Sequence, residues 1–412
     1  MQAENKKNKI ETFSFGCRLN ALEVEKIRKM LVGHIPQAIV VNTCAVTGEA
    51  ERQSGQAVRK IARSNPNVPI FVTGCAATRN PELFKNIDNT TVIDNKQKMQ
   101  FEAYLGYPTP MTNANNCVDD HDCCRMSKQF IQIQNGCNHA CTYCITRQLR
   151  GPSVSFKYSD ILNDVKIAVT NGFYEIVLTG VDIASYINVE NGMPVLISDL
   201  CKRLLNDVPE IQRLRLSSVD PAVPDIDNVI DLILSDSRMM PHLHFSMQSG
   251  SDTILRAMGR RHNAERIKSL VKRGMGKITF SWDIICGFPG ETEQLFQETL
   301  DLIQETKPIK IHAFPFSPRP GTPAADMGNQ VNRSVSKKRV KIITELADQC
   351  RIDFMRSQIG KTVQVLVENN NMGRCIHDIA VKIHGKQIDA RSICDVTLVG
   401  VSEGCFSAQI KK

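Results

Sequence analysis

The sequence predicts an α/β protein in three parts: a parallel α/β domain at residues 1–126, a partial (β/α)6 barrel at residues 127–358, and a small all-β module at residues 359–412. In the first two parts, short apolar runs alternate with amphipathic helical patterns, which is typical of parallel sheets. In the last part, strand-like runs follow one another without helices between them.

The N-terminal part contains three predicted strands and two predicted helices. The strands are the runs "TFSF", "AIVV" and "IFVT", and the helices are "ALEVEKIRKML" and "GEAERQSGQAVRKIA". Residues 108–128 are polar and contain prolines, so they are predicted to form an exposed linker with Cys117, Cys123 and Cys124 in a surface loop.

The middle part contains six predicted strands, "FIQIQ", "EIVLT", "RLRLS", "HLHFSM", "ITFSWDII" and "KIHAFPF". Helical patterns separate them, at 159–170, 225–235, 263–273 and 291–305 among other places. Six repeated β/α units indicate a parallel barrel, or part of one, with its chemistry at the carboxyl ends of the strands. An open doubly wound sheet gives a similar pattern.

The C-terminal part begins after a basic helical segment. Residues 331–361 carry eight Lys or Arg against three Asp or Glu, which predicts either a solvated helix face or a surface that meets nucleic acid. Three short strands follow, "TVQVLVEN", "IAVKIHG" and "DVTLVG".

Composition narrows the functional class. The chain has 412 residues, a formal net charge of +8 and 15 cysteines. A basic balance favours a polyanionic partner. Because no run of about 18 apolar residues and no secretory signal occurs, a cytoplasmic protein without a membrane contact is expected. Metal or redox use of cysteine is then favoured over disulfides. Six isolated cysteines are assigned to core packing: Cys201, Cys286, Cys350, Cys375, Cys394 and Cys405.

Three cysteines follow the first predicted barrel strand in the stretch "NGCNHACTYC". Cys137, Cys141 and Cys144 are spaced C-x3-C-x2-C, which lets a tight loop gather three thiolates around one iron–sulfur cluster. Zinc is the alternative, but a closed zinc site needs a fourth ligand. His139 would have to fold back between its neighbours to supply it. A 4Fe–4S cluster with three thiolates instead leaves one iron open.

A second cysteine trio is spread over the N-terminal part. Cys17, Cys44 and Cys75 each follow one of the three predicted strands, and the carboxyl ends of parallel strands converge on one crevice. Gly16 and Gly74 would let the backbone approach a ligand closely. A second cluster is therefore predicted, the alternative being three unrelated cysteines in strand-to-helix turns.

The C-x3-C-x2-C spacing with Tyr143 before the last cysteine resembles the signature of the radical S-adenosylmethionine (SAM) superfamily. Two such trios, with a C-terminal β module, resemble the methylthiotransferases of that superfamily, whose last domain is an RNA-binding TRAM module. The likeness to the subgroup that acts on threonylcarbamoyladenosine in tRNA is carried by "GCRLNALEVE", "NTCAVTGEAER" and "FPFSPRPGTPAA". Further motifs of the resemblance are "LTGVDIASY", "RLRLSSVDP", "LHFSMQSGSD" and "DIICGFPGET".

The resemblance implies two 4Fe–4S clusters with different roles. Cys137, Cys141 and Cys144 would hold the SAM-cleaving cluster, and the N-terminal trio an auxiliary cluster that carries sulfur. With two SAM per turnover, a methylthio group would be inserted at carbon 2 of the adenine at position 37 of tRNA. An electron donor such as flavodoxin or ferredoxin and a monomeric enzyme are expected. Alternatives are isopentenyladenosine or a ribosomal-protein side chain as substrate, or a non-catalytic iron–sulfur or zinc RNA-binding protein.

Further contacts are predicted at the carboxyl ends of later strands. Gly180 and Asp182 are expected to contact SAM, the alternative being a turn with a helix-capping Asp. Ser246 and Gln248 are candidates for SAM or base contacts. Gly287 in "GFPGE" could cradle the adenine or form a tight turn. Two arginines are predicted to contact RNA, the first with a solvated turn as its alternative: Arg260 and Arg319.

Overall fold

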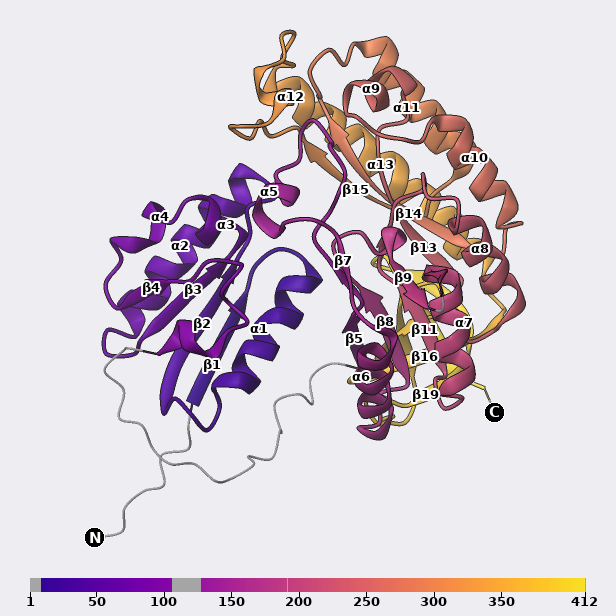
Figure 1. Ribbon diagram of the computed structural model, residues 1–412. Helices are drawn as coiled ribbons and strands as arrows, with labels where there is room; N and C mark the ends of the chain where they lie inside the picture. The colour runs from indigo at the N-terminus through magenta and orange to yellow at the C-terminus, as the bar shows by residue number, and fades with distance from the viewer. Residues whose placement is uncertain (1–8, 106–126, 191, 412) are drawn as a thin grey trace.

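The computed structural model describes residues 9–105, 127–190 and 192–411. It confirms the predicted α/β class: an N-terminal α/β domain lies beside a larger β/α unit, and a β-barrel module follows at the C-terminal end (Figure 1). The predicted linker loop with Cys117, Cys123 and Cys124 falls outside the described residues. Among the described helices, none combines the length and the apolar composition that a bilayer span requires.

The N-terminal domain is built on a parallel sheet in the order β1-β2-β3-β4. Its strands are β1 (Lys9–Ser14), β2 (Gln37–Thr43), β3 (Ile70–Gly74) and β4 (Thr90–Val92). Its helices are α1 (Arg18–Leu31), α2 (Gly48–Ser64), α3 (Cys75–Arg79), α4 (Glu82–Lys85) and the 3-10 helix η1 (Phe101–Tyr104). The three predicted strands are confirmed. The sequence analysis missed β4, since three half-buried residues give no readable alternation.

Helices cover both faces of this sheet because successive strand residues point in opposite directions. Val40 faces α1, where it packs with Val24 and Ile27. Val41 faces the other side, where Val58 of α2 is buried. The continuous apolar runs of β2 and β3 therefore reflect strands buried on both faces.

The central unit contains two parallel sheets, β5-β8-β11 and β12-β13-β14-β15. The strands are β5 (Lys128–Gln132), β8 (Glu175–Thr179), β11 (Arg213–Leu216), β12 (Ser218–Val219), β13 (His242–Gln248), β14 (Thr279–Cys286) and β15 (Lys310–Pro315). Only Ser217 separates β11 from β12, so the chain itself joins the two sheets. The strands follow one another in sequence order without a reversal, which identifies a partial barrel and not a doubly wound sheet.

One long helix follows most barrel strands and covers the outside of the barrel. These helices are α6 (Tyr158–Thr170), α7 (Ile197–Asp207), α8 (Ile226–Ser235), α10 (Ala264–Arg273), α11 (Glu293–Thr306) and α13 (Arg333–Ser357). Shorter elements lie in the connecting loops: β6 (Gln134–Asn135), α5 (Thr146–Arg150), β7 (Val154–Ser155), η3 (Ile183–Ser185), β9 (Ile187–Glu190), β10 (Met193–Leu196), α9 (Asp252–Ala257) and α12 (Pro323–Asp326).

The predicted basic segment forms α13, which runs from the barrel to the C-terminal module (Figure 1). Arg339 of this helix is buried, and its guanidinium donates to the carboxylate of Glu291 at 2.8 Å. Lys337, Lys338 and Arg356 are exposed, so most of the positive charge of the helix faces solvent.

The C-terminal module is a closed barrel in the order β16-β17-β18-β20-β19. Its strands are β16 (Thr362–Asn369), β17 (Met372–Cys375), β18 (Ala380–His384), β19 (Ile393–Ser402) and β20 (Cys405–Ile410). The all-β prediction is confirmed. The sequence analysis missed β17, which is short and contains Gly373 and Arg374, and it missed β20.

The isolated cysteines agree in part with the core-packing prediction. Cys201, Cys286 and Cys375 are buried among apolar side chains. Cys350, Cys394 and Cys405 are only half-buried, so for these three residues the prediction is only partly correct.

Candidate active site

The N-terminal trio converges as the topology predicts. Cys17 lies between β1 and α1, Cys44 directly follows β2, and Cys75 directly follows β3 as the first residue of α3. All three line one cavity of about 660 Å³. Cys44 is buried, whereas Cys75 is half-buried and Cys17 is exposed to the cavity.

Two glycines make this convergence sterically possible. Gly16 has φ +91°, and a Cβ placed on it would lie 2.4 Å from the Sγ atom of Cys44. Gly74 has φ +97°, and its Cβ would lie 2.3 Å from Oδ1 of Asn42. The close approach predicted from these glycines is therefore an approach to the neighbouring strand-to-helix turns.

The donor set of this trio fits a metal cluster. Burial is the main reason why the pKa of the Cys44 thiol is raised to about 11, and the nearby thiols of Cys17 and Cys75 contribute to the rise. A metal centre can bind such a thiol as the thiolate, because its positive charge offsets the cost of ionisation. All three are free cysteines, so none is consumed by a disulfide.

The second trio lies in the loop after β5 and β6. Backbone hydrogen bonds shape this loop: the Cys137 N–H donates to the Gly151 carbonyl at 3.1 Å, and the Cys144 N–H donates to the Cys141 carbonyl at 3.1 Å. Thr142 fixes the loop to the end of α9, because its hydroxyl donates to the Ala257 carbonyl at 2.9 Å. Burial raises the pKa of the Cys137 thiol to about 11, with smaller contributions from Asp182 and the other two thiols.

Helix α5 joins the second trio to the N-terminal domain. Ile145 and Leu149, which follow Cys144, are buried in the apolar core beneath α2 and α3. Asn95 connects the two segments, because its Nδ2 donates to the Leu149 carbonyl at 3.2 Å and to Cys75 Sγ at 3.8 Å. Figure 1 shows α5 between the two domains. Apolar packing therefore holds the two trios on adjoining segments of the site.

A buried ionic network crosses the same junction. Arg150 at the end of α5 donates to Glu23 of α1 at 2.8 Å and to Asn20 at 2.6 Å. Glu23 also pairs with Lys98 at 2.6 Å. Burial by itself raises the pKa of Glu23, but Lys98 and Arg150 outweigh this effect, so the pKa is lowered. Arg150 lines the cavity beside the N-terminal trio. The sequence analysis missed Arg150, although it is only six positions after Cys144.

His139, the fourth ligand considered for the zinc alternative, lies beside Cys137 and Asp182. Its Nε2 lies 2.6 Å from Asp182 Oδ2, and the donor atoms of Cys137, His139 and Asp182 all lie within 4.8 Å of one another. This group contains neither Cys141 nor Cys144, so it is not the closed zinc site of the alternative. The guanidinium of Arg261 also contacts His139 Nε2, at 2.9 Å. Because a cation already occupies this side of the imidazole, the group is a poor zinc site.

Arg260 is buried beside the second trio, which corrects its prediction as an RNA contact or part of a solvated turn. Its guanidinium lies 3.5 Å from Cys141 Sγ, donates to the Ser246 carbonyl at 2.8 Å and pairs with Asp220 at 3.1 Å. The side chain is 6% exposed. Its charge therefore acts on the cysteine loop and not on a phosphate. Asp220, in the motif "SSVDP", is a site residue that the sequence analysis missed.

The loop after β8 is tied to the cysteine loop by Gln134. The Gln134 amide oxygen accepts the N–H groups of Val181 and Asp182 at 3.0 and 2.9 Å. A Cβ on Gly180 would lie 2.7 Å from the Gln134 carbonyl, so glycine is required for this packing. Asp182 makes no helix-capping hydrogen bond, which removes the alternative of a capping role. Gly180 lines the cavity.

Three other predicted contacts have different environments. Ser246 lines the cavity. Gln248 has φ +76°, at an irregular register between β13 and β14, and such a strained backbone is often found at functional sites. Tyr143 packs edge-on against Phe288 with ring centroids 6.5 Å apart, so it supports the cysteine loop.

Gly287 occupies a closed turn. Its N–H donates to the Glu291 carboxylate at 2.5 Å, and its φ is +76°. The Gly287 N–H is therefore satisfied inside the turn, and an adenine contact through other backbone groups of "GFPGE" stays a prediction. The alternative prediction, a tight turn before a helix, is confirmed.

Arg319 is also buried, which corrects the second predicted RNA contact. Its guanidinium donates to the Ala45 carbonyl and to the Glu51 carboxylate, both at 2.7 Å, and the side chain is 5% exposed. Both partners belong to the N-terminal domain, next to Cys44. Arg319 therefore fixes the barrel to the turn that carries this cysteine.

The cavity extends from the N-terminal trio through the inside of the barrel to the C-terminal module. Polar side chains from β13, β14 and β15 and from the module line it, including His242, His244, Ser281, Asp283, Lys310, His312, Arg374 and His377. A volume of about 660 Å³ is in the range of cavities that bind whole small molecules. The cavity can therefore accommodate a nucleobase between the N-terminal trio and the C-terminal module, next to Thr146, which follows the second trio.

Comparisons with known proteins agree with this arrangement. Residues 131–303 match the model of the radical SAM superfamily, and residues 9–94 match a family described as "Uncharacterized protein family UPF0004". Among solved structures, the radical SAM methyltransferase TsrM from Kitasatospora setae has a TM-score of 0.53 and 13% identity, covering 75% of this chain and 69% of that chain. This likeness concerns the fold alone.

Curated relatives are similar over nearly the whole chain. The threonylcarbamoyladenosine tRNA methylthiotransferase MtaB of Rickettsia prowazekii is 39% identical over 96% of both chains. The enzyme of the same name from Chlamydia pneumoniae is 35% identical over 86% of this chain and 85% of its own. A tRNA-2-methylthio-N(6)-dimethylallyladenosine synthase from Paenarthrobacter aurescens is 30% identical over 86% of this chain and 73% of its own.

Proposed function

The chain belongs to the threonylcarbamoyladenosine tRNA methylthiotransferases of the radical SAM superfamily, and on that premise we propose that it inserts a methylthio group at carbon 2 of N6-threonylcarbamoyladenosine at position 37 of tRNA. One observation carries the proposal: α5 packs the loop of the second cysteine trio into the domain that holds the first trio, beside one cavity. Both trios can therefore serve the same base.

Cys137, Cys141 and Cys144 are the proposed ligands of a SAM-binding 4Fe–4S cluster. Such a cluster supplies an electron for SAM cleavage, which yields a radical able to remove hydrogen from an inert aromatic carbon. The protein's part is to hold the loop through Thr142 and Gln134 and to place the Arg260 cation against Cys141. Asp182 and Gly180 are proposed contacts of the SAM methionine group.

Cys17, Cys44 and Cys75 are the proposed ligands of a second 4Fe–4S cluster, which supplies the sulfur for transfer. Their shared cavity and their positions in the turns after three neighbouring strands support this assignment. Two SAM molecules per turnover are proposed, one as methyl donor and one as radical source. Arg150 and Arg319 keep the turns around this trio in place through Glu23, Asn20 and Ala45.

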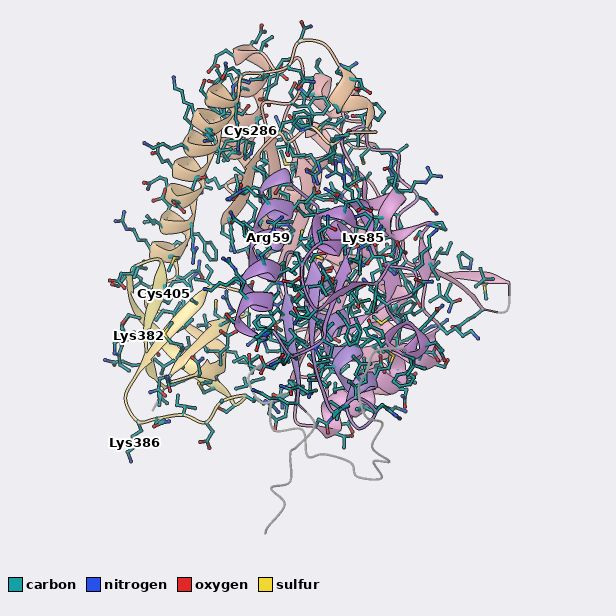
Figure 2. The ribbon with its side chains drawn as sticks, turned by 90° about the vertical axis from the view of Figure 1, so that its left-hand side faces the viewer. Arg59, Lys85, Cys286, Lys382, Lys386 and Cys405 are labelled. Atoms are coloured by element: carbon teal, nitrogen blue, oxygen red, sulfur yellow. The ribbon has the colours of Figure 1, made fainter. Side chains whose placement is uncertain are left out.

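Exposed cations give the tRNA a surface to bind. Lys382 and Lys386 project from the outer face of the C-terminal module, and Arg59 and Lys85 lie on the N-terminal domain (Figure 2). Such side chains bind phosphate without reading sequence. We propose a cytoplasmic monomer that receives electrons from a flavodoxin or ferredoxin.

Nucleoside mass spectrometry tests the proposed substrate. In tRNA from a strain that lacks the gene, methylthio-threonylcarbamoyladenosine should disappear while methylthio-isopentenyladenosine stays at its normal level. The unmodified threonylcarbamoyladenosine should accumulate, and re-expression of the gene should restore the product. Loss of the isopentenyl product instead would assign the chain to the alternative substrate.

A further inference from the structure

Strand β15 presents a row of polar and aromatic side chains to the cavity. Lys310, His312 and Phe314 alternate with buried Ile311, as expected for one face of a strand, and all three line the cavity. The rings of His312 and Phe314 are nearly parallel, at 16° with centroids 6.5 Å apart. Phe314 is 43% exposed, which leaves an aromatic surface on which a nucleobase can stack.

We propose that Lys310 and Arg18 form a subsite for the carboxylate of the threonylcarbamoyl group, and so select this base over an uncharged one. The inference rests on the proposed function and adds the residues that recognise its substrate. It concerns residues that neither cysteine trio includes.

Lys310 lies in the cavity without a counterion. Its ammonium group makes no hydrogen bond or ion pair with any residue that the structure describes. Burial lowers the pKa of Lys310, and Arg374, Arg351 and Arg18 lower it further, whereas Asp378 raises it. Asp378 is committed elsewhere, because its carboxylate pairs with Lys128 at 2.9 Å. Because Lys310 is exposed to the cavity, its ammonium group is accessible to a bound anion.

Arg18 lies on the other side of the same space. It follows Cys17, lines the cavity and has its guanidinium 5.7 Å from the ring centroid of Phe130 on β5. It has no carboxylate partner in the described part of the chain. Strands β5 and β15 are the two edge strands of the open barrel, and the charge of Arg18 is near enough to Lys310 to help lower its pKa.

The orientation of β15 matches the shape of the modified base. Phe314 lies toward the carboxyl end of the strand, where the cysteines are, and Lys310 lies four residues back, about 13 Å along the strand. An adenine stacked on Phe314 would have its threonylcarbamoyl substituent extended toward Lys310. An isopentenyl group in the same place would leave the ammonium unpaired, which sites built for polar groups strongly disfavour.

Lys310 and Arg18 could bind an oxyanion from either of two sources, the threonine carboxylate or a backbone phosphate of the tRNA. Two anticodon stem-loops separate the sources: one with threonylcarbamoyladenosine, and one with the methyl ester of the same group. They differ in the carboxylate charge and in the one methyl group of the ester. Affinities are measured by fluorescence anisotropy with anaerobically reconstituted protein, so the readout does not depend on turnover.

The wild type should bind the acid about 10- to 100-fold more tightly than the ester, as expected for a charge-assisted hydrogen bond. Lys310→Gln should abolish this preference through weaker binding of the acid alone, Lys310→Arg should retain most of it, and Arg18→Gln should reduce it. Lys277→Gln, an exposed control in the turn before β14, should leave the ratio unchanged. Iron content is measured in each variant, because Arg18 adjoins Cys17.

Equal weakening of both RNAs by Lys310→Gln would assign the ammonium to a phosphate and overturn the inference. An unchanged preference in that variant would overturn it as well. Failure of the proposed function is distinct: the reconstituted wild type would then form no methylthio product on the acid stem-loop, whatever its binding preference.

Discussion

At the scale of single residues, the site consists of the proposed cluster ligands and the side chains that position them. The six cysteines of the two trios were found from their positions after strands. The cations around them were not: Arg150 was overlooked, and Arg260 and Arg319 were predicted to contact RNA. All three are buried against acidic or carbonyl partners. Sequence shows that an arginine is present but not whether its partner is a distant carboxylate or a phosphate.

Substitution of one cysteine in each trio separates their roles. Cys141→Ala should lose the SAM-binding cluster and abolish formation of 5′-deoxyadenosine, while Cys44→Ala should retain this cleavage and lose methylthiolation. Each variant should hold about four irons per chain, against about eight in the wild type, as expected for loss of one four-iron cluster.

Both readouts are taken on anaerobically reconstituted protein, with Cys201→Ala as a control for a buried cysteine outside the trios. Normal product from Cys44→Ala would contradict the assignment of the second cluster. About one zinc and no iron in the wild type would favour the non-catalytic alternative.

At the scale of elements, the β1–α1 turn depends on Gly16. Gly16→Ala would place a methyl group 2.4 Å from Cys44 Sγ, in addition to straining the backbone at φ +91°. Iron content should fall from about eight toward about four per chain, because the Cys44 thiol is displaced. Iron analysis and SAM-cleavage assays measure the change, and cleavage should persist.

Gly172→Ala is the matched control for this prediction. Gly172 also has a positive φ, +77°, but a Cβ there meets no atom within 4 Å. Backbone strain should cost it about 1–2 kcal/mol, measured by urea unfolding, with normal iron content. Equal iron loss in both variants would mean that backbone strain alone displaces the cluster.

At the scale of the whole molecule, buried charges fasten the C-terminal module to the barrel. Glu175 pairs with Arg213 and Arg215 at 2.8 and 2.9 Å. Both arginines donate to carbonyls of the module, Arg213 to Cys375 at 3.1 Å and Arg215 to Ile376 at 3.2 Å. Burial by itself raises the pKa of Glu175, but these two arginines and Lys128 outweigh it and lower the pKa to about 2.

The lowered pKa sets the direction of a pH effect. Because the folded pKa lies below the unfolded value of about 4.3, the contribution of Glu175 is full above about pH 5 and is lost as the pH falls toward 2. Glu175→Gln should cost about 3–5 kcal/mol at pH 7, as for other buried ion pairs with one partner removed. The difference from the wild type should shrink in acid.

Urea unfolding at pH 7 and pH 4 measures this prediction, with limited proteolysis to follow release of the C-terminal module. The control is Glu305→Gln, which removes an exposed pair with Lys268 and should cost less than about 1 kcal/mol at either pH. A pH-independent difference for Glu175→Gln would show that the carboxylate charge does not fasten the module.

The sequence by itself determined the three-part α/β organisation and both cysteine trios. Apolar periodicity and the placement of cysteines after strands involve residues that are close together in sequence, so both patterns can be read from the sequence directly. Only the tertiary structure decided that α5 packs into the N-terminal core, that Arg260 lies against Cys141, and that Lys310 faces the cavity unpaired. These three features depend on contacts between segments that are far apart in sequence. Burial and charge pairing between such segments produce no periodic pattern in the sequence.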